Sequence, residues 1–198
     1  MRTLEITIPD EVADTLDKLV GRLSFSVGDV LALGVSQLTP DSRLKPWMPR
    51  EQWDALVKGA TCPICPTLAS QVLSPDFGYL IADLSLSRFI LLANQYIPGY
   101  CILTCSKHVV ELYDMTAEER TMYFHDLACA ASAIARVFQP IKLNYEILGN
   151  STPHLHCHIK PRYMDDPFPR APFLAVGRAI LTPTEYADRV AALRSALN

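Results

Sequence analysis

No run of apolar residues in this 198-residue sequence approaches the roughly 18 that a membrane-spanning helix needs. The first residues also lack the basic start and apolar stretch of a secretory signal, so we expect a protein of the cytoplasm. There is no excess of positive charge either. The formal net charge of -3 gives no general attraction to nucleic acid. Any phosphate chemistry must therefore come from a local site.

Internal repeats and low-complexity segments are absent too, and what remains is the composition of a folded domain. Hydrophobic residues make up 49% of the chain and charged residues 20%. A chain of this length can bury a core without covalent cross-links. In a reducing compartment the six cysteines are not expected to form disulfides, so cysteine pairs are first interpreted as metal ligands.

Residues 1–45 are expected to form a small strand-helix-helix unit with a linker. Leu4, Ile6 and Ile8 alternate with polar residues, as in a half-buried strand, and two short helical patterns follow. The order resembles a ribbon-helix-helix unit, in which two chains pair their strands. Acidic residues outnumber basic ones here, so dimerisation or partner binding is favoured over DNA binding. The linker is a proline-rich stretch at residues 39–50.

Residues 46–198 are expected to form one α+β domain, an antiparallel sheet with a long helix packed on it. Strands are predicted at Tyr79 to Ala82, Phe89 to Leu92, Tyr100 to Leu103, Lys142 to Ile147 and Pro153 to Lys160, with a turn at Pro98-Gly99. A short helix is predicted around Glu51 to Lys58.

Two further helices are marked by capping boxes. In the first, Thr116 pairs with Glu119, and in the second Thr182 pairs with Glu185. The buried stripe of the first helix is predicted to contain Met122, Leu127, Ala131, Ile134, Ala135 and Phe138. This helix should end before Pro140.

Three of the five histidines, His154, His156 and His158, alternate along one predicted strand. Side chains alternate between the faces of a strand, so the three imidazoles share one face. Their neighbours Leu155, Cys157 and Ile159 share the other. The triplet alone is compatible with a three-histidine metal centre or with histidine nucleophilic catalysis. Three such positions span roughly 13 Å, which is awkward for one tetrahedral ion.

The residues just before this strand favour catalysis. Gly149, Asn150 and Ser151 offer backbone N–H groups, an amide and a hydroxyl, which can hold phosphate oxygens. A second motif, Cys62-Pro63-Ile64-Cys65, has three possible interpretations: a zinc knuckle, a redox pair or two buried thiols. Cys129 and Cys157 are expected in the core, and His125 at the surface or in packing.

The motif residues resemble the histidine triad (HIT) family, whose signature is His-φ-His-φ-His-φ-φ with φ apolar. The resemblance rests on Asn144, Gly149-Asn150, Pro153 to His158 and Pro161-Arg162-Tyr163, and extends to Gln95, Pro98-Gly99 and Lys107-His108. It covers roughly residues 50 to 175. Lys160 departs from the last apolar position.

The resemblance implies that His156 attacks the α-phosphorus of a nucleotide and forms a phosphohistidine that water hydrolyses. One ring nitrogen attacks while the other needs a hydrogen-bond acceptor. In this family that acceptor is a main-chain carbonyl, expected here from the segment Asn144 to Ile147. His158, Asn150 and Ser151 would meet the charge on the phosphoryl group.

The implied substrate contacts are Asn94, Asn144, Gly149, Asn150, Ser151 and Arg162. Relatives often place an aspartate on the strand before the Pro-Gly turn to bind ribose. The equivalent position here is Leu92, and Asn94 is the expected substitute. Arg162 has two open roles, a phosphate contact or an ion pair with Asp165 or Asp166.

A subset of the family pairs a cysteine knuckle with two histidines, which implies a structural zinc site of Cys62, Cys65, His108 and His154. His156 and His158 then remain for catalysis. The family likeness also implies a homodimer formed partly through the helix near Thr116. The predicted function is nucleotide hydrolysis. A nucleotidyltransferase and a nucleotide-sensing binding module remain as alternatives.

Overall fold

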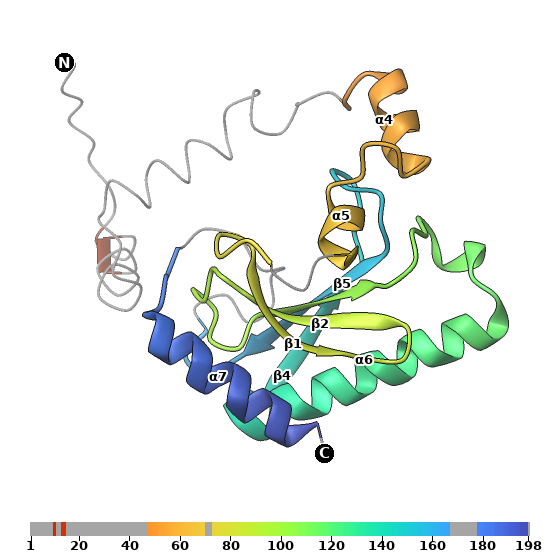
Figure 1. Ribbon diagram of the computed structural model, residues 1–198. Helices are drawn as coiled ribbons and strands as arrows, with labels where there is room; N and C mark the ends of the chain where they lie inside the picture. Colours follow the sequence, from red (N-terminus) through yellow and green to blue (C-terminus); the bar gives the residue numbers. More distant parts are fainter. Residues whose placement is uncertain (1–9, 11–12, 15–46, 70–72, 167–177, 198) are drawn as a thin grey trace. The chain divides into compact units, whose positions relative to one another are not determined.

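The computed structural model describes residues 10, 13–14, 47–69, 73–166 and 178–197 (Figure 1). The chain divides into two compact units, residues 1–47 with 170–177 and residues 48–169 with 178–198. The second unit contains the histidine motif. The predicted strand-helix-helix unit falls almost wholly outside the described residues, so that prediction and its boundary stay predictions.

The second unit is an α+β domain around a five-stranded antiparallel sheet in the order β1-β2-β3-β5-β4, which confirms the predicted fold class. Its strands are β1 (Gly78–Asp83), β2 (Ser87–Leu92), β3 (Cys101–Cys105), β4 (Lys142–Glu146) and β5 (His156–Arg162). Its helices are α4 (Arg50–Val57), α5 (Ile64–Ala69), the 3-10 turn η1 (Leu112–Asp114), α6 (Ala117–Phe138) and α7 (Pro183–Ala196). No helix of the described residues is long and apolar enough to cross a membrane.

Both predicted capping boxes are present. Thr116 and Thr182 each accept a hydrogen bond from the backbone of the glutamate three residues later, and each glutamate bonds back. The long helix α6 ends at Phe138 as predicted, with Gln139 in the left-handed conformation at its C-cap. The N-terminal boundaries of α6 and α7 are therefore fixed by these local capping interactions.

The buried stripe of α6 differs from the prediction at Met122 and at Ala135, which is exposed. Met122 is exposed, and its neighbour Tyr123 is fully buried instead. Tyr123, Leu127 and Ile134 recur at helical spacing, so the stripe passes through residue 123 and leaves residue 122 about 100° to one side. Cys129 was predicted in the core and is only half-buried, for the same reason.

The helices α6 and α7 pack on one face of the sheet, where the main core lies (Figure 1). Phe89, Leu103, Cys157 and Ile159 from three strands meet Tyr123, Ile134, Tyr186 and Leu193 from the two helices. The opposite face of β2 and β3 carries a smaller apolar cluster around Ile90 and Ile102. On that second face the catalytic histidines are expected.

Strand β5 begins at His156, three residues later than predicted, and continues to Arg162. His154 therefore precedes the strand. Helix α5 was not predicted. The sequence there was interpreted only as a cysteine knuckle, but a helix starts at Ile64, one residue before the second cysteine.

Candidate functional site

The alternation of β5 separates its side chains as the sequence predicted. Cys157 and Ile159 enter the core beneath the helices, while His156 and His158 lie on the other face. His156 faces Thr104 across the β3–β5 ladder, and His158 faces Ile102. Directly opposite residues of antiparallel strands share a face. The two histidines therefore lie next to the smaller apolar cluster.

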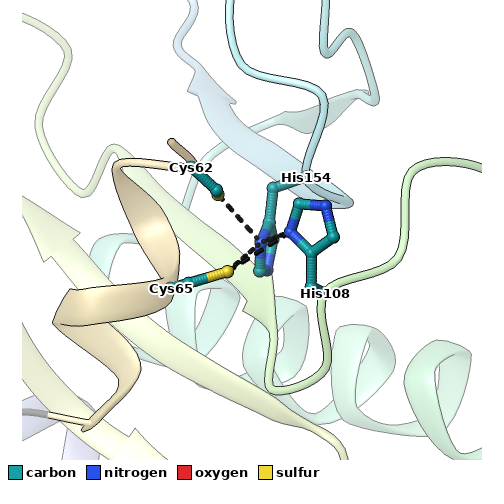
Figure 2. A group of neighbouring side chains, drawn as sticks. All are labelled: Cys62, Cys65, His108 and His154. Carbon is teal, nitrogen blue, oxygen red and sulfur yellow. Dashed lines mark hydrogen bonds between the residues drawn. The ribbon is translucent and has the colours of Figure 1, made fainter. Parts of the chain in front are cut away.

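Ahead of the strand, His154 turns into a cluster with Cys62, Cys65 and His108, and the four side chains point toward one another (Figure 2). Their ligand atoms all lie within 4.8 Å of one another. The Cys65 Sγ lies 3.2 Å from the Nδ1 of His108, and that Nδ1 lies 3.2 Å from the Nδ1 of His154. Cys62 Sγ to His154 Nδ1 is 3.5 Å. The structure thus brings together the four predicted ligands.

These separations fit one tetrahedral metal ion. Metal–ligand bonds of about 2.0 to 2.3 Å imply edges of about 3.3 to 3.8 Å between ligands. Burial and the adjacent Cys62 together raise the pKa of the Cys65 thiol to about 11. A thiolate at Cys65 is therefore disfavoured unless a cation lies beside it, as a bound metal ion would.

The outer nitrogens of the two histidines are both occupied. His108 Nε2 lies 2.9 Å from the carbonyl of Val57, and His154 Nε2 lies 2.8 Å from the carbonyl of Cys105. A carbonyl can only accept, so each Nε2 carries the proton and each Nδ1 keeps its lone pair for the cluster. This arrangement of ligand and carbonyl acceptor is typical of metal-binding histidines.

The backbone around the cluster is adapted to it. Gly59, with φ of 77°, ends the turn after α4, and a Cβ at this position would lie 3.1 Å from the His108 ring. A glycine is therefore needed for the close approach of the imidazole. On the other side Arg88 of β2 donates 2.7 Å to the carbonyl of Thr67 in α5, which ties the helix holding Cys65 to the sheet.

The Nδ1 of His156 lies 2.6 Å from the main-chain carbonyl of His154. This corrects the expectation that the acceptor comes from residues 144–147. In the β4–β5 register Glu146 faces His158, so that segment runs beside the later part of β5. The carbonyl of His154 lies just outside the strand and is closer to the ring. It fixes the proton on Nδ1 and leaves the lone pair on Nε2.

His158 makes a different contact. Its Nδ1 lies 2.8 Å from the hydroxyl of Tyr100, which precedes β3. Burial lowers the pKa of His158 to about 4, with His156 and Lys160 adding to the effect, so its ring is neutral at physiological pH. Tyr100 was placed on a strand by the sequence, but no residue pattern predicted this contact, which depends on the β3–β5 register.

Lys160 lies on the same face, two residues beyond His158. Its Nζ forms an ion pair of 2.6 Å with Glu146 and lies 5.5 Å above the ring of Tyr100. The Lys160 side chain is 10% exposed. The residue that departs from the family signature therefore belongs to the polar face of β5.

Of the two roles expected for Arg162, a phosphate contact or an ion pair with Asp165 or Asp166, the structure contains an ion pair. The Nε of Arg162 donates 2.6 Å to the amide oxygen of Asn144, and Nη1 pairs with Asp166. Both side chains of the ion pair are nearly buried. The ion pair with Asp166 is thus formed, and Asn144 and Arg162 hold each other at the end of the sheet.

The remaining predicted substrate residues lie in two loops, one before β5 and one after β2. Gly149 adopts a positive φ of 87°, which favours glycine, and Asn150 and Ser151 are exposed. The amide oxygen of Asn94 accepts from the backbone N–H groups of Tyr96 and Ala179, at 3.1 and 3.0 Å. That oxygen therefore already organises the loop after β2.

Leu92, at the predicted ribose position, packs against the smaller apolar cluster. His125 is exposed on α6, as expected, with its Nε2 3.6 Å from the sulfur of Cys129. Cys157 is fully buried. Within the described part of the chain Leu92 and His125 form no hydrogen bond with the histidines of β5, and the Cys157 thiol donates only to the main-chain carbonyl of His158, at 3.7 Å.

A protein family model and a curated protein both match this chain. A family model described as HIT domain matches residues 80–165. The Bacillus subtilis (strain 168) protein named Protein hit is 31% identical over 110 residues, which are 52% of this chain and 71% of that protein.

Solved structures share the fold. A histidine triad protein from Marinobacter aquaeolei VT8 has a TM-score of 0.58 at 22% identity, covering 69% of this chain and 96% of its own. A zinc-bound histidine triad family protein from Mycobacterium smegmatis has a TM-score of 0.52 at 18% identity, covering 70% and 94%.

Proposed function

The chain belongs to the histidine triad family, and from this premise we propose that it hydrolyses a nucleotidyl phosphoanhydride, ester or phosphoramidate through His156. The observation that carries the proposal is the bond from the His156 ring to the His154 carbonyl. With Nδ1 protonated, Nε2 keeps its lone pair. A neutral imidazole of this kind is nucleophilic at neutral pH without further activation.

The reaction has two balanced steps. His156 Nε2 forms a bond to the α-phosphorus, while the bond from phosphorus to the leaving group breaks and its electron pair departs with that group. Water then forms a bond to phosphorus and releases one proton, which balances the proton taken up by the leaving group, and the electrons of the N–P bond return to Nε2. The products are the nucleoside monophosphate and the protonated leaving group.

Charge on the phosphoryl oxygens is met by neighbouring donors. His158 lies beside the nucleophile, with ring centroids 5.0 Å apart. Asn150, Ser151 and the backbone at Gly149 are exposed ahead of β5 and are proposed phosphate contacts. Asn144, Arg162 and Asn94 would act mainly by shaping the site, because their polar groups bond within the protein. Positioning and electrostatic stabilisation dominate phosphoryl transfers.

Cys62, Cys65, His108 and His154 would hold a structural zinc ion. The ion would cross-link the α4–α5 segment, the loop after β3 and the start of β5. His154 links this site to the nucleophile, because its ring is a proposed ligand and its carbonyl orients His156. The metal ligands would therefore position the catalytic strand.

Two assembly proposals accompany this function. We propose a homodimer in the cytoplasm formed partly through α6, where Met122 and Phe124 are exposed on opposite flanks of the buried Tyr123. Residues 1–45 would add dimerisation or partner binding. Sedimentation of the full chain, compared with a variant lacking residues 1–45, tests both: a monomeric full chain would contradict the first, and an unchanged dimer affinity would contradict dimerisation through residues 1–45.

The test of activity is a panel of dinucleoside polyphosphates, nucleoside phosphoramidates and aminoacyl-type adenylates. We expect His156→Ala to lose about a thousandfold or more in kcat on every substrate that the wild type turns over. His125→Ala is the matched control, since His125 is exposed on α6. Turnover unchanged in His156→Ala would disprove the proposal. Analysis of the products with and without added phosphate acceptors distinguishes hydrolysis from nucleotidyl transfer to the acceptor.

A further inference from the structure

His156 and His158, on the face of β5 opposite α6 and α7, have hydrogen-bond partners of opposite kind. The Nδ1 of His156 faces the His154 carbonyl at 2.6 Å, and the Nδ1 of His158 faces the Tyr100 hydroxyl at 2.8 Å. A carbonyl can only accept a proton, whereas a phenol can also donate one. The two rings are otherwise similar, and lie edge to face 5.0 Å apart.

The hydroxyl of Tyr100 is set up to donate. Burial raises the pKa of Tyr100 well above its usual value, and the nearby Glu146 raises it further, so the phenol keeps its proton. Among the described residues, the Nδ1 of His158 is the one hydrogen-bond partner of this hydroxyl. A half-buried hydroxyl that can donate to a neutral imidazole nitrogen will do so.

Charged groups hold the tyrosine in this place. Lys160 lies 5.5 Å above the Tyr100 ring, a distance typical of a cation–π contact, and is itself fixed by Glu146 at 2.6 Å. A cation over the ring draws electron density from the phenol and makes its O–H a better donor. Glu146 faces His158 across the β4–β5 ladder, so the three side chains surround the histidine.

We propose that Tyr100, supported by Lys160 and Glu146, is a positioning residue that holds His158 in the Nε2–H tautomer. The nucleophile His156 is held in the opposite, Nδ1–H tautomer by the His154 carbonyl. His156 then offers a lone pair to phosphorus while His158 offers an N–H to the phosphoryl oxygens. This inference rests on the proposed function for its catalytic part, but the tautomers exist without substrate.

The test reads the tautomers directly by nitrogen NMR of the histidine rings in the metal-loaded, full-length protein at neutral pH. His158→Asn assigns the signals of His158 by their loss. We expect protonated Nε2 at His158 and protonated Nδ1 at His156. An Nδ1–H tautomer at His158 in the wild type overturns the proposal, whether or not a substrate is known.

Tyr100→Phe removes only the hydroxyl. We expect His158 to lose its single tautomer, and kcat to fall about tenfold with KM little changed, because one transition-state hydrogen bond is misdirected. Tyr145→Phe is the control, since Tyr145 is exposed on β4. An unchanged tautomer or an unchanged kcat in Tyr100→Phe overturns the proposal. Failure of the proposed function gives a different result, because His156→Ala would then retain turnover while the tautomers stay as stated.

Discussion

The two faces of the sheet are built from the same strands but by different interactions. On the face covered by α6 and α7, Cys157 and Ile159 are fully buried in apolar contacts. On the opposite face His156, His158 and Lys160 each bond to a particular partner. Apolar burial has no direction, whereas a hydrogen bond fixes an orientation. The covered face therefore supplies stability, and the histidine face supplies orientation.

The cluster of Cys62, Cys65, His108 and His154 is linked to the histidine face. The His154 ring is a proposed metal ligand, and the His154 carbonyl orients His156. We expect about one zinc ion per purified chain and loss of most of it in Cys65→Ser. Free zinc at roughly a thousand times its Kd stabilises a fold by about 4 kcal/mol, and the variant should lose about that much.

Metal analysis and chemical denaturation measure these two quantities. Cys129→Ser is the control, since Cys129 lies on α6 and its sulfur is 3.6 Å from the Nε2 of His125, outside the four-residue cluster. Less than about half an equivalent of zinc in wild-type protein that has not met a chelator would count against the four-ligand site.

The next largest expected effect is on the free energy of unfolding, which should respond differently to a substitution in the covered face and to one at an exposed position. Leu103→Ala on the covered face, where Leu103 is fully buried, should lower the free energy of unfolding by about 3 kcal/mol. Ile147→Ala, at an exposed position, should change it by about 0.5 kcal/mol or less. Urea unfolding followed by circular dichroism checks both values. Equal losses would show that the core is not where the structure has it.

The smallest effect is a pH dependence from the histidine face. The pKa of His158 is lowered to about 4, mainly by burial. As pH falls below the unfolded value of about 6.5, the unfolded chain binds a proton that the folded ring resists. Stability is thus lost between about pH 6.5 and 4. His158 is only half-buried, so we expect about 1 kcal/mol after solvent screening.

The comparison is between wild type and His158→Asn, so that contributions from other groups cancel. The wild type should lose about 1 kcal/mol more than the variant over this interval. Parallel stability curves for the two proteins would rule out this role of His158.

Local features of the fold could be predicted because their signals lie within a few residues. The capping boxes at Thr116 and Thr182 and the alternation of β5 are patterns of this kind. The metal cluster was predicted by resemblance, since Cys62 and His154 are far apart in the chain. The predicted α6 stripe was wrong at Met122, whose large neighbour Tyr123 is buried in its place, and at Ala135, which is exposed.

What the sequence could not predict depends on strand register. The contact of Tyr100 with His158 requires the pairing of β3 with β5, and the place of Glu146 beside Lys160 requires that of β4 with β5. The acceptor of His156 was expected on the neighbouring strand and lies on the same segment, at His154. Register arises from packing over the whole sheet, so single-sequence patterns do not encode it locally.

The central claim is that His156 becomes covalently attached to the substrate phosphorus. Rapid quenching during one turnover, followed by mass mapping of the protein, tests it most directly. We expect a nucleotidyl adduct on His156 that is absent in His156→Ala. Turnover with the adduct on His158, or on another residue altogether, would contradict it.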